Sequence, residues 1–371
     1  MFRVSDVSQW VLSGHLGTRL TEKREVIEQQ REQVDRYLET GGVAYGFTTL
    51  FGHLDAFATS PSALLLEGHT VGRPSPITQD LFRSILAVKL CQLSNGGSGI
   101  SPETFDLLIE TFQTPPTNVE IDLEASYGCG DVVPGAWLAK SLFESEPDLR
   151  AGDLMCLMNG SYFGAGVALH TNSEMRDLFE EAWETLNAAR ETALAVQGDS
   201  TVQLPVSLRD LQPLRIVIDR AEKNLQIALE HSLNANSGNP LFEFERGTAK
   251  PVSNSSFLDF QLSLSLNETT ETCKVVSSYL VGATRWLDHL AEATLADEAK
   301  PLSVQFPKIS KAYHDTIVAS SGNASYAQAE SRDIEDVSDS SLIRALKLKR
   351  FLGLLSHQIG FLTSILKLLE N

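Results

Sequence analysis

Residues 124–140 read Glu-Ala-Ser-Tyr-Gly-Cys-Gly-Asp-Val-Val-Pro-Gly-Ala-Trp-Leu-Ala-Lys, and the rest of the chain can be interpreted outward from them. The stretch places Cys129 between two glycines, adds Asp131 and opens a helical pattern at Pro134. Glycine accepts backbone dihedral angles that a β-carbon forbids, and it leaves its amide unshielded. We therefore predict a tight turn before a helix, at which the backbone as well as the thiol is open to chemistry.

The chain has 371 residues, of which 42% are hydrophobic, so it can bury a large core in one elongated domain or in two. We predict a loop-rich N-terminal region, 1–200, that carries the turn, and a long-helix bundle, 201–371, within one continuous domain. The formal net charge of -18 repels phosphate backbones and anionic lipid. The apolar run 154–169 is too short and too interrupted to span a membrane, so we expect it to be buried in protein. Neither a nucleic acid nor a membrane is expected as a partner.

The four cysteines are far apart in the sequence and show no paired ligand spacing. That distribution is typical of reduced thiols and argues against a disulfide framework or a zinc site, so no bound metal is expected. The first residues, Met1 to Asp6, lack the apolar segment of a secretory signal, and we expect a cytoplasmic protein.

Helical periodicity dominates most of the chain, and no sustained alternation predicts a strand pair. Apolar residues recur at helical spacing in 213–231, and the runs 257–295 and 342–369 are each long enough to cross a domain. Shorter helices are predicted at 18–39, at 79–93, after the Ser101-Pro102 cap, from Pro134 to Ser145, and at 172–196. The predicted fold class is mainly α: an elongated bundle of long antiparallel helices with a loop-rich N-terminal region. Short hairpins are expected in the first third at most.

Three interpretations of Cys129 follow from its surroundings. Its place before a helix start would lower the pKa of a thiol and favour a nucleophilic thiolate, although no Cys/His signature is adjacent. It could instead be a small buried residue in a tight turn. In the third, the amide of Gly130 attacks the carbonyl of Gly128, a five-membered ring closes, and loss of the side-chain sulfur leaves an exocyclic alkene. That product is an electrophile that no ordinary side chain supplies.

Other short motifs follow one another in a set order along the chain. They are Tyr45-Gly46-Phe47-Thr48-Thr49-Leu50-Phe51-Gly52, Leu64-Leu65-Leu66-Glu67-Gly68-His69, Asn95-Gly96-Gly97-Ser98-Gly99, Leu157-Met158-Asn159-Gly160-Ser161, Gln203-Leu204-Pro205-Val206-Ser207-Leu208-Arg209, Asn234-Ala235-Asn236-Ser237-Gly238-Asn239-Pro240-Leu241 and Glu335-Asp336-Val337. In these residues the chain resembles the aromatic amino acid ammonia-lyase and aminomutase family, which includes histidine, phenylalanine and tyrosine ammonia-lyases. The resemblance extends over nearly the whole chain and implies an ammonia-lyase-like helical fold.

In that family an Ala-Ser-Gly-Asp turn condenses with itself into the electrophile methylidene-imidazolone (MIO), and Gly128-Cys129-Gly130-Asp131 occupies that position. The resemblance therefore implies an autocatalytic MIO formed from Gly128, Cys129 and Gly130. It also implies that Tyr45 acts as the general base and that Glu335 lies near the substrate amine.

The same resemblance implies a small-molecule substrate and the residues that bind it. Arg209 would clamp a carboxylate with two hydrogen bonds, and Asn159 and Gln203 would orient the electrophile and the substrate. His69 falls where histidine lyases carry a pocket histidine, and Phe257 would pack near the reactive ring. Family members are homotetramers whose sites draw residues from several subunits, so a homotetramer is expected.

The chain departs from the family pattern at positions that concern the chemistry. Cys129 replaces the serine that loses water, so ring formation would instead release hydrogen sulfide. Gly128 replaces an alanine, which should loosen the turn. Val206 stands where the family has a second active-site tyrosine, and Leu50 replaces a loop glycine and disfavours a positive φ there.

Three functions remain open on these grounds. The first is a carbon–nitrogen lyase or 2,3-aminomutase that acts on an amino-acid-like substrate through an electrophile at Cys129. The second keeps the fold but not the electrophile, and catalyses another elimination, addition or cyclisation in specialised metabolite biosynthesis. The third is a catalytically dead homologue that binds a ligand or a partner subunit.

Overall fold

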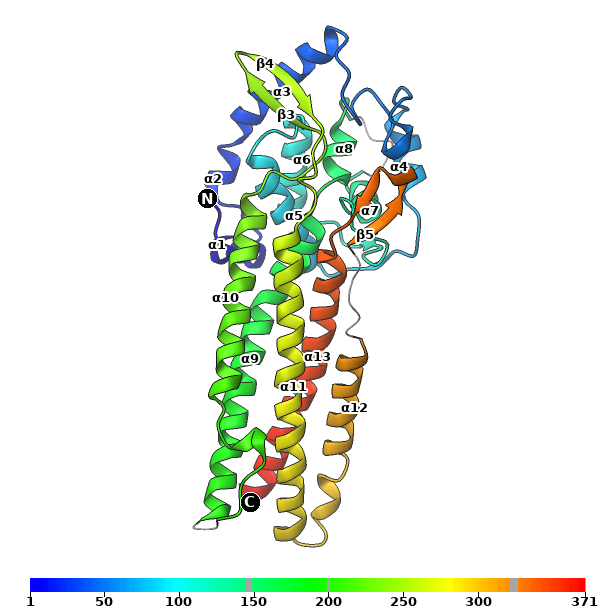
Figure 1. The fold of residues 1–371 in the computed structure, drawn as a ribbon. Helices are drawn as coiled ribbons and strands as arrows, with labels where there is room; N and C mark the ends of the chain where they lie inside the picture. The colour runs from blue at the N-terminus through cyan, green and yellow to red at the C-terminus, as the bar shows by residue number, and fades with distance from the viewer. Residues whose placement is uncertain (144–148, 199–200, 321–325, 371) are drawn as a thin grey trace. The chain divides into compact units, whose positions relative to one another are not determined.

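The computed structural model describes residues 1–143, 149–198, 201–320 and 326–370, which Figure 1 shows as a ribbon. These residues form two compact units that interleave along the chain. The first unit comprises Met1–His170, Gln226–Leu264 and Ala324–Ala345, and the second comprises Thr171–Leu225, Ser265–Asn323 and Leu346–Asn371. The boundaries of these units differ from those of the predicted regions 1–200 and 201–371. The division into those two regions stays a prediction.

Helices dominate both units, which confirms the mainly α fold class. The helices that lie in the first unit are α1 (Val4–Ser13), α2 (Thr18–Thr21), α3 (Arg24–Glu39), α4 (Ser62–His69), α5 (Gln79–Ser94), α6 (Pro102–Gln113), α7 (Val132–Ser141) and α8 (Asp153–Met158). The long helices α9 (Tyr162–Gln197), α10 (Gln212–Asn234), α11 (Phe260–Thr294) and α13 (Ser341–Glu370) contribute residues to both units, and α12 (Phe306–Ala319) belongs to the second. The predicted end of one helix at Ser145 lies outside the described residues.

Helix α5 is the core of the first unit. It is buried along nearly its whole length from Leu81 to Ser94, because its side chains are almost all apolar or small. The Thr78 side chain accepts the Leu81 N–H at its start, and α6 begins with the predicted Ser101 cap and a proline in the first turn. The run 154–169 is buried throughout, as predicted.

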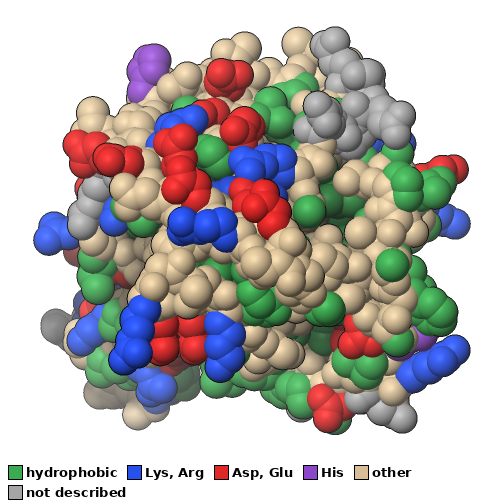
Figure 2. All heavy atoms as spheres, turned by 90° about the horizontal axis from the view of Figure 1, so that it is seen from above, with side chains coloured by type: hydrophobic (Ala, Val, Ile, Leu, Met, Phe, Trp, Pro, Cys, Tyr) green, Lys and Arg blue, Asp and Glu red, His purple; other side chains and the backbone are tan. Residues whose placement is uncertain are grey.

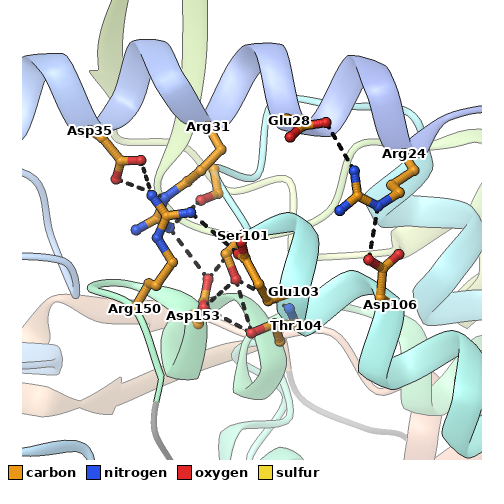
Figure 3. A network of polar contacts seen from close by, with 11 residues as sticks. Arg24, Glu28, Arg31, Asp35, Ser101, Glu103, Thr104, Asp106, Arg150 and Asp153 are labelled. Carbon is orange, nitrogen blue, oxygen red and sulfur yellow. Dashed lines mark hydrogen bonds and ion pairs between the residues drawn. The ribbon is translucent and has the colours of Figure 1, made fainter.

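A buried polar network ties α3, α6 and α8 together (Figure 3). Arg31 is only 2% exposed, and its guanidinium donates to Asp35, to the Gly99 carbonyl and to Asp153. Asp153 also accepts hydrogen bonds from Ser101 and Thr104, so the charges and donors of the network satisfy one another. Burial raises the pKa of Asp153, and Arg31 and Ser101 oppose that shift. Because Asp153 opens α8, the network fixes the helix that ends beside Asn159.

Three short antiparallel strand pairs interrupt the helices. They are β1 (Ser75–Pro76) with β2 (Glu120–Ile121), β3 (Leu241–Glu245) with β4 (Thr248–Val252), and β5 (Ala327–Glu330) with β6 (Glu335–Val337). The expectation that hairpins are confined to the first third was therefore wrong. The β3–β4 hairpin turns at Arg246-Gly247, both of which have positive φ, and its apolar alternation is too short to stand out among helical signals.

Within the second unit, polar side chains pair across helices that are otherwise joined by apolar faces. Arg215 on α10 lies 2.6 Å from Glu180 on α9. Gln358 on α13 accepts from Ser277 on α11 and donates to the carbonyl of Ser310 on α12. The contacts of Gln358 satisfy buried polar groups on three helices.

Helix α13 is the one helix among the described residues that is long and apolar enough to cross a membrane by length and composition. Its buried side chains recur three or four residues apart: Leu348, Phe351, Leu352, Leu355, Ile359, Leu362 and Ile365. That spacing is typical of a helix with one face in a protein core.

On the face drawn in Figure 2, Lys and Arg side chains lie interspersed with Asp and Glu.

Candidate active site

The Gly128–Asp131 turn is held by backbone hydrogen bonds on both sides. The Gly128 carbonyl accepts the Asp339 N–H at 2.9 Å, and the Gly130 carbonyl accepts the Gly160 N–H at 3.0 Å. Gly128 and Gly130 have φ of 80° and 75°, and a β-carbon on residue 128 would lie 2.1 Å from the Asp339 carbonyl oxygen. Glycine at position 128 therefore permits a close backbone approach.

The Gly130 N–H and the Gly128 carbonyl are the two backbone groups that would react in a ring closure, and their hydrogen bonding suits that reaction. Gly130 is buried, and among the described residues its N–H has no hydrogen-bond partner. Buried N–H groups without a partner are rare in folded proteins. The Gly128 carbonyl, in contrast, is polarised by the Asp339 N–H.

The Cys129 thiol is a buried hydrogen-bonding group. It is 2% exposed, lies 3.2 Å from the Val337 carbonyl oxygen to which it donates, and accepts from Gln328 Nε2 at 3.0 Å. Burial, with the charges of Glu335 and Asp339, raises the pKa of Cys129 to about 12. The lowered pKa expected at a helix start is therefore not found, because burial and two carboxylates raise the pKa of the thiol.

Asp131 is a buried carboxyl beside the turn. It accepts a hydrogen bond from Ser126 Oγ, and burial together with the charge of Asp339 raises the pKa of Asp131 to about 7. Asp339 is itself held by the N–H groups of Asp259 and Ser341. The turn thus ends in a carboxyl that can carry a proton at neutral pH.

A cavity of about 410 Å³ lies next to the turn. It brings together four predicted site residues from distant parts of the chain: Tyr45, His69, Asn159 and Glu335. Apolar side chains form much of the wall, among them Leu50, Phe51, Leu64, Leu65, Val132 and Met155. Tyr127 also lines the cavity, whereas Cys129 itself does not.

Tyr45 carries a feature suited to a base. Its hydroxyl oxygen accepts the Gly52 N–H at 2.7 Å, a contact that stabilises the phenolate form. Burial nevertheless raises the pKa of Tyr45, and the charges of Glu335 and Asp55 act in the same direction. Leu50 is not among the residues with positive φ, so its replacement of a glycine causes no backbone strain of that kind.

Glu335 is oriented by the segment that precedes it. Ser331 Oγ donates to Glu335 Oε2, and Ser331 also lines the cavity. Ser331 and Arg332 have φ of 48° and 56°, which is uncommon for residues other than glycine. Such backbone conformations often occur at functional sites.

Asn159 joins the turn to the cavity. It is 8% exposed, and its Oδ1 atom has no hydrogen-bond partner among the described residues. Its Nδ2 atom would lie 2.6 Å from a β-carbon on Gly130. Its backbone carbonyl accepts from Lys89 Nζ at 2.9 Å, and burial lowers the pKa of Lys89 to about 7. Lys89 also lies 4.3 Å from the ring centroid of Tyr162.

His69 and Phe51 form one aromatic wall, with ring centroids 5.3 Å apart. His69 Nδ1 lies 2.6 Å from the Leu65 carbonyl oxygen. A carbonyl only accepts, so Nδ1 donates this hydrogen bond, and in the neutral ring Nε2 is then the acceptor.

Other predicted residues lie outside this cavity. Gln203 and Arg209 belong to the second unit, where both are exposed and Arg209 Nε donates to the Leu204 carbonyl at 2.6 Å. Phe257 is half-buried in the first unit and does not line the cavity. Sequence reasoning gave no role to Tyr127 or Ser331. The signal for Tyr127 was a large aromatic residue directly before the Gly-Cys-Gly turn.

Sequence comparisons with known proteins show similarity to amino acid lyases. A family model described as aromatic amino acid lyase matches residues 3–155. The chain is 25% identical over 213 residues to histidine ammonia-lyase of Caldanaerobacter subterraneus, a match that covers 56% of this chain and 39% of that protein. It is 30% identical over 136 residues to histidine ammonia-lyase of Rattus norvegicus, covering 35% of this chain and 21% of the relative. The matches thus span less than half the length of these relatives.

Solved structures show the same fold. Phenylalanine aminomutase of Pantoea agglomerans has a TM-score of 0.78 at 16% identity, and the alignment covers 98% of this chain and 88% of that one. Ergothionase of Treponema denticola has a TM-score of 0.82 at 15% identity, with 99% and 88% covered. Histidine ammonia-lyase of Trypanosoma cruzi has a TM-score of 0.79 at 16% identity, with 98% and 82% covered.

Proposed function

We propose that the chain, whose residues 3–155 match the model of the aromatic amino acid lyase family, is an enzyme that eliminates ammonia from an amino acid or shifts its amino group. The observation that carries this proposal is the cavity that unites Tyr45, Asn159 and Glu335 next to the Gly-Cys-Gly turn. A base, an amide and a carboxylate around an apolar cavity are the groups that such an elimination requires.

The turn fits an MIO in two respects: the buried Gly130 N–H is unpartnered among the described residues, and the Gly128 carbonyl is polarised by Asp339. In the condensation that we propose, a bond forms between Gly130 N and the Gly128 carbonyl carbon. The Gly128 oxygen leaves as water with the amide protons of Cys129 and Gly130. Cys129 Sγ then leaves as hydrogen sulfide with the Cα proton. The product supplies an electrophile for the substrate.

The remaining steps depend on ordinary side chains. Tyr45, whose phenolate is stabilised by the Gly52 N–H, removes a β-proton from the substrate. Glu335, held by Ser331, and Asn159 Oδ1 accept hydrogen bonds from the amino group. His69 Nε2 and the apolar wall receive the substrate side chain.

Two proposed residues, Gln203 and Arg209, belong to the second unit. We place them in the site through a homotetramer, in which one copy completes the cavity of another and Arg209 binds the substrate carboxylate. Phe257 is retained as a residue that packs near the reactive ring. The homotetramer, the cytoplasmic location and the expected lack of nucleic-acid and membrane partners stay predictions.

One observation favours the second candidate function, in which Cys129 remains a thiol. The buried Sγ atom is covered by Gln328 and the Val337 carbonyl, and Cys129 does not line the cavity. In that case the cavity catalyses another elimination, addition or cyclisation with Tyr45 and Glu335, or binds a ligand without turnover.

Assays of L-histidine, L-phenylalanine and L-tyrosine for deamination and for β-amino acid formation test the proposal. Tyr45→Phe should lower kcat by roughly a hundredfold or more, because it removes the base. Cys129→Ala should abolish turnover if the electrophile exists and preserve it in the second candidate function. Absence of turnover by the wild-type chain on every amino acid tested would contradict the proposed activity.

A further inference from the structure

Tyr127 is a second phenol in the cavity that contains Tyr45. It comes two residues before Cys129 in the sequence and is 39% exposed. Its hydroxyl has no hydrogen-bond partner among the described residues. The buried Tyr162, in contrast, donates to the Leu157 carbonyl at 2.7 Å, and the Tyr45 oxygen accepts the Gly52 N–H. The Tyr127 hydroxyl is therefore available to a ligand.

The ionisable groups that act on Tyr127 belong to the cavity and to the Gly128–Asp131 turn. Burial raises the pKa of Tyr127 the most. The charges of four neighbours raise it further: Glu335, Cys129, Tyr45 and Asp131. Tyr127 thus stays a neutral phenol through neutral pH, and a neutral phenol can donate a hydrogen bond or a proton. Tyr45, in contrast, has the Gly52 N–H to stabilise its negative form.

Tyr127 and Tyr45 are the two tyrosines that line the cavity in the described part of the chain. Val206, at the position of the second tyrosine in the resembling family, is 68% exposed, belongs to the second unit and has no hydroxyl. A second phenol is therefore present in this site, and it comes from the segment that leads into the turn.

We propose that Tyr127 is a catalytic proton donor that works with Tyr45 as the base, an inference that rests on the proposed function. When Tyr45 takes the β-proton, the electron pair of the C–H bond forms the new double bond and the pair of the C–N bond stays on nitrogen. Tyr127 O–H gives its proton to that nitrogen, so a neutral amino group leaves as ammonia. Tyr45 then releases its proton to solvent and Tyr127 takes one up, which restores both residues.

The first arm of the test needs no substrate. Tyrosines labelled with ¹³C at the ring carbon that bears the hydroxyl are followed by NMR through an alkaline titration. Tyr45→Phe should lower the apparent pKa of Tyr127, because the charge of the Tyr45 phenolate is removed. The matched control Tyr313→Phe, on α12 in the second unit, should leave Tyr127 unchanged. An unchanged Tyr127 titration in Tyr45→Phe would overturn the inference whatever the activity of the chain.

The second arm measures turnover of the amino acids named above. Tyr127→Phe should lower kcat by roughly a hundredfold or more with KM changed only a few-fold, while Tyr313→Phe keeps wild-type rates. Thermal unfolding checks that Tyr127→Phe is folded. Turnover that survives Tyr127→Phe would remove this inference alone, with the proposed function intact. Coupling between the phenols without turnover by the wild-type chain would remove the proposed function and the role of Tyr127 with it.

Discussion

Gly128 and Asp339 are in direct backbone contact: the Asp339 N–H donates to the Gly128 carbonyl at 2.9 Å, and a β-carbon on residue 128 would lie 2.1 Å from the Asp339 carbonyl oxygen. The contact joins the turn to the segment that leads into α13. It holds the carbonyl at which ring closure would occur.

Replacement of Gly128 by alanine should therefore destabilise the protein for two reasons. Its φ of 80° is unfavourable for any residue with a β-carbon, which costs about 1–2 kcal/mol. Displacement of the Asp339 backbone adds a further ~1–3 kcal/mol. Gly247→Ala is the matched control, because φ there is 81° and nothing lies within 4 Å of the added carbon. Urea unfolding of both variants measures the difference, and equal losses would contradict the close approach.

Arg31→Met should lower the free energy of unfolding by about 3–5 kcal/mol, because it leaves Asp153 charged and buried without its partner. Arg24 on the same helix is the control, since its pairs with Glu28 and Asp106 are 40% exposed on the arginine side (Figure 3). Arg24→Met should cost far less than Arg31→Met, because exposed ion pairs contribute little to stability. Similar values for the two variants would show that the network does not anchor α8.

Lys89 should make stability depend on pH. Burial lowers its pKa from 10.5 to about 7, so between these values the unfolded chain binds more protons than the folded one. The contribution of Lys89 to stability therefore rises with pH across this window, and its unfavourable effect is complete below pH 7. The free energy of unfolding of Lys89→Met, measured with urea, should be highest relative to that of the wild type at pH 6. This difference should shift in favour of the wild type as the pH rises toward 10.

Lys311→Met is the control for that experiment, because Lys311 is exposed and paired with Asp315. Its stability relative to the wild type should hardly vary over the same pH range. A difference between Lys89→Met and the wild type that is constant with pH would show that Lys89 keeps an ordinary pKa in the folded chain.

Much of the fold could be predicted from the sequence, because long helices repeat their apolar residues over many turns. The runs that became α10 and α13 illustrate this, since their buried positions follow helical spacing. The β3–β4 hairpin, in contrast, depends on five residues in each strand and on a turn at Arg246-Gly247. A signal that short is easily hidden among helical segments.

The candidate site was predictable only where a motif marked it. Tyr45, Asn159 and Glu335 lie in motifs, and the structure brings them to one cavity. Tyr127 lies in no motif, and its role depends on neighbours that come from distant segments. The close contact of Gly128 with Asp339 could not be foreseen for the same reason, because the two residues are far apart in the chain.

The central claim is that Gly128, Cys129 and Gly130 condense into an electrophile, and the intact mass of the purified chain tests it most directly. We expect the wild-type mass to be lower than the sequence mass by one water and one hydrogen sulfide. Cys129→Ser should lose two waters, and Cys129→Ala should keep its full mass apart from the substitution. A wild-type chain with the full sequence mass would contradict the claim and leave the helical scaffold with an ordinary thiol.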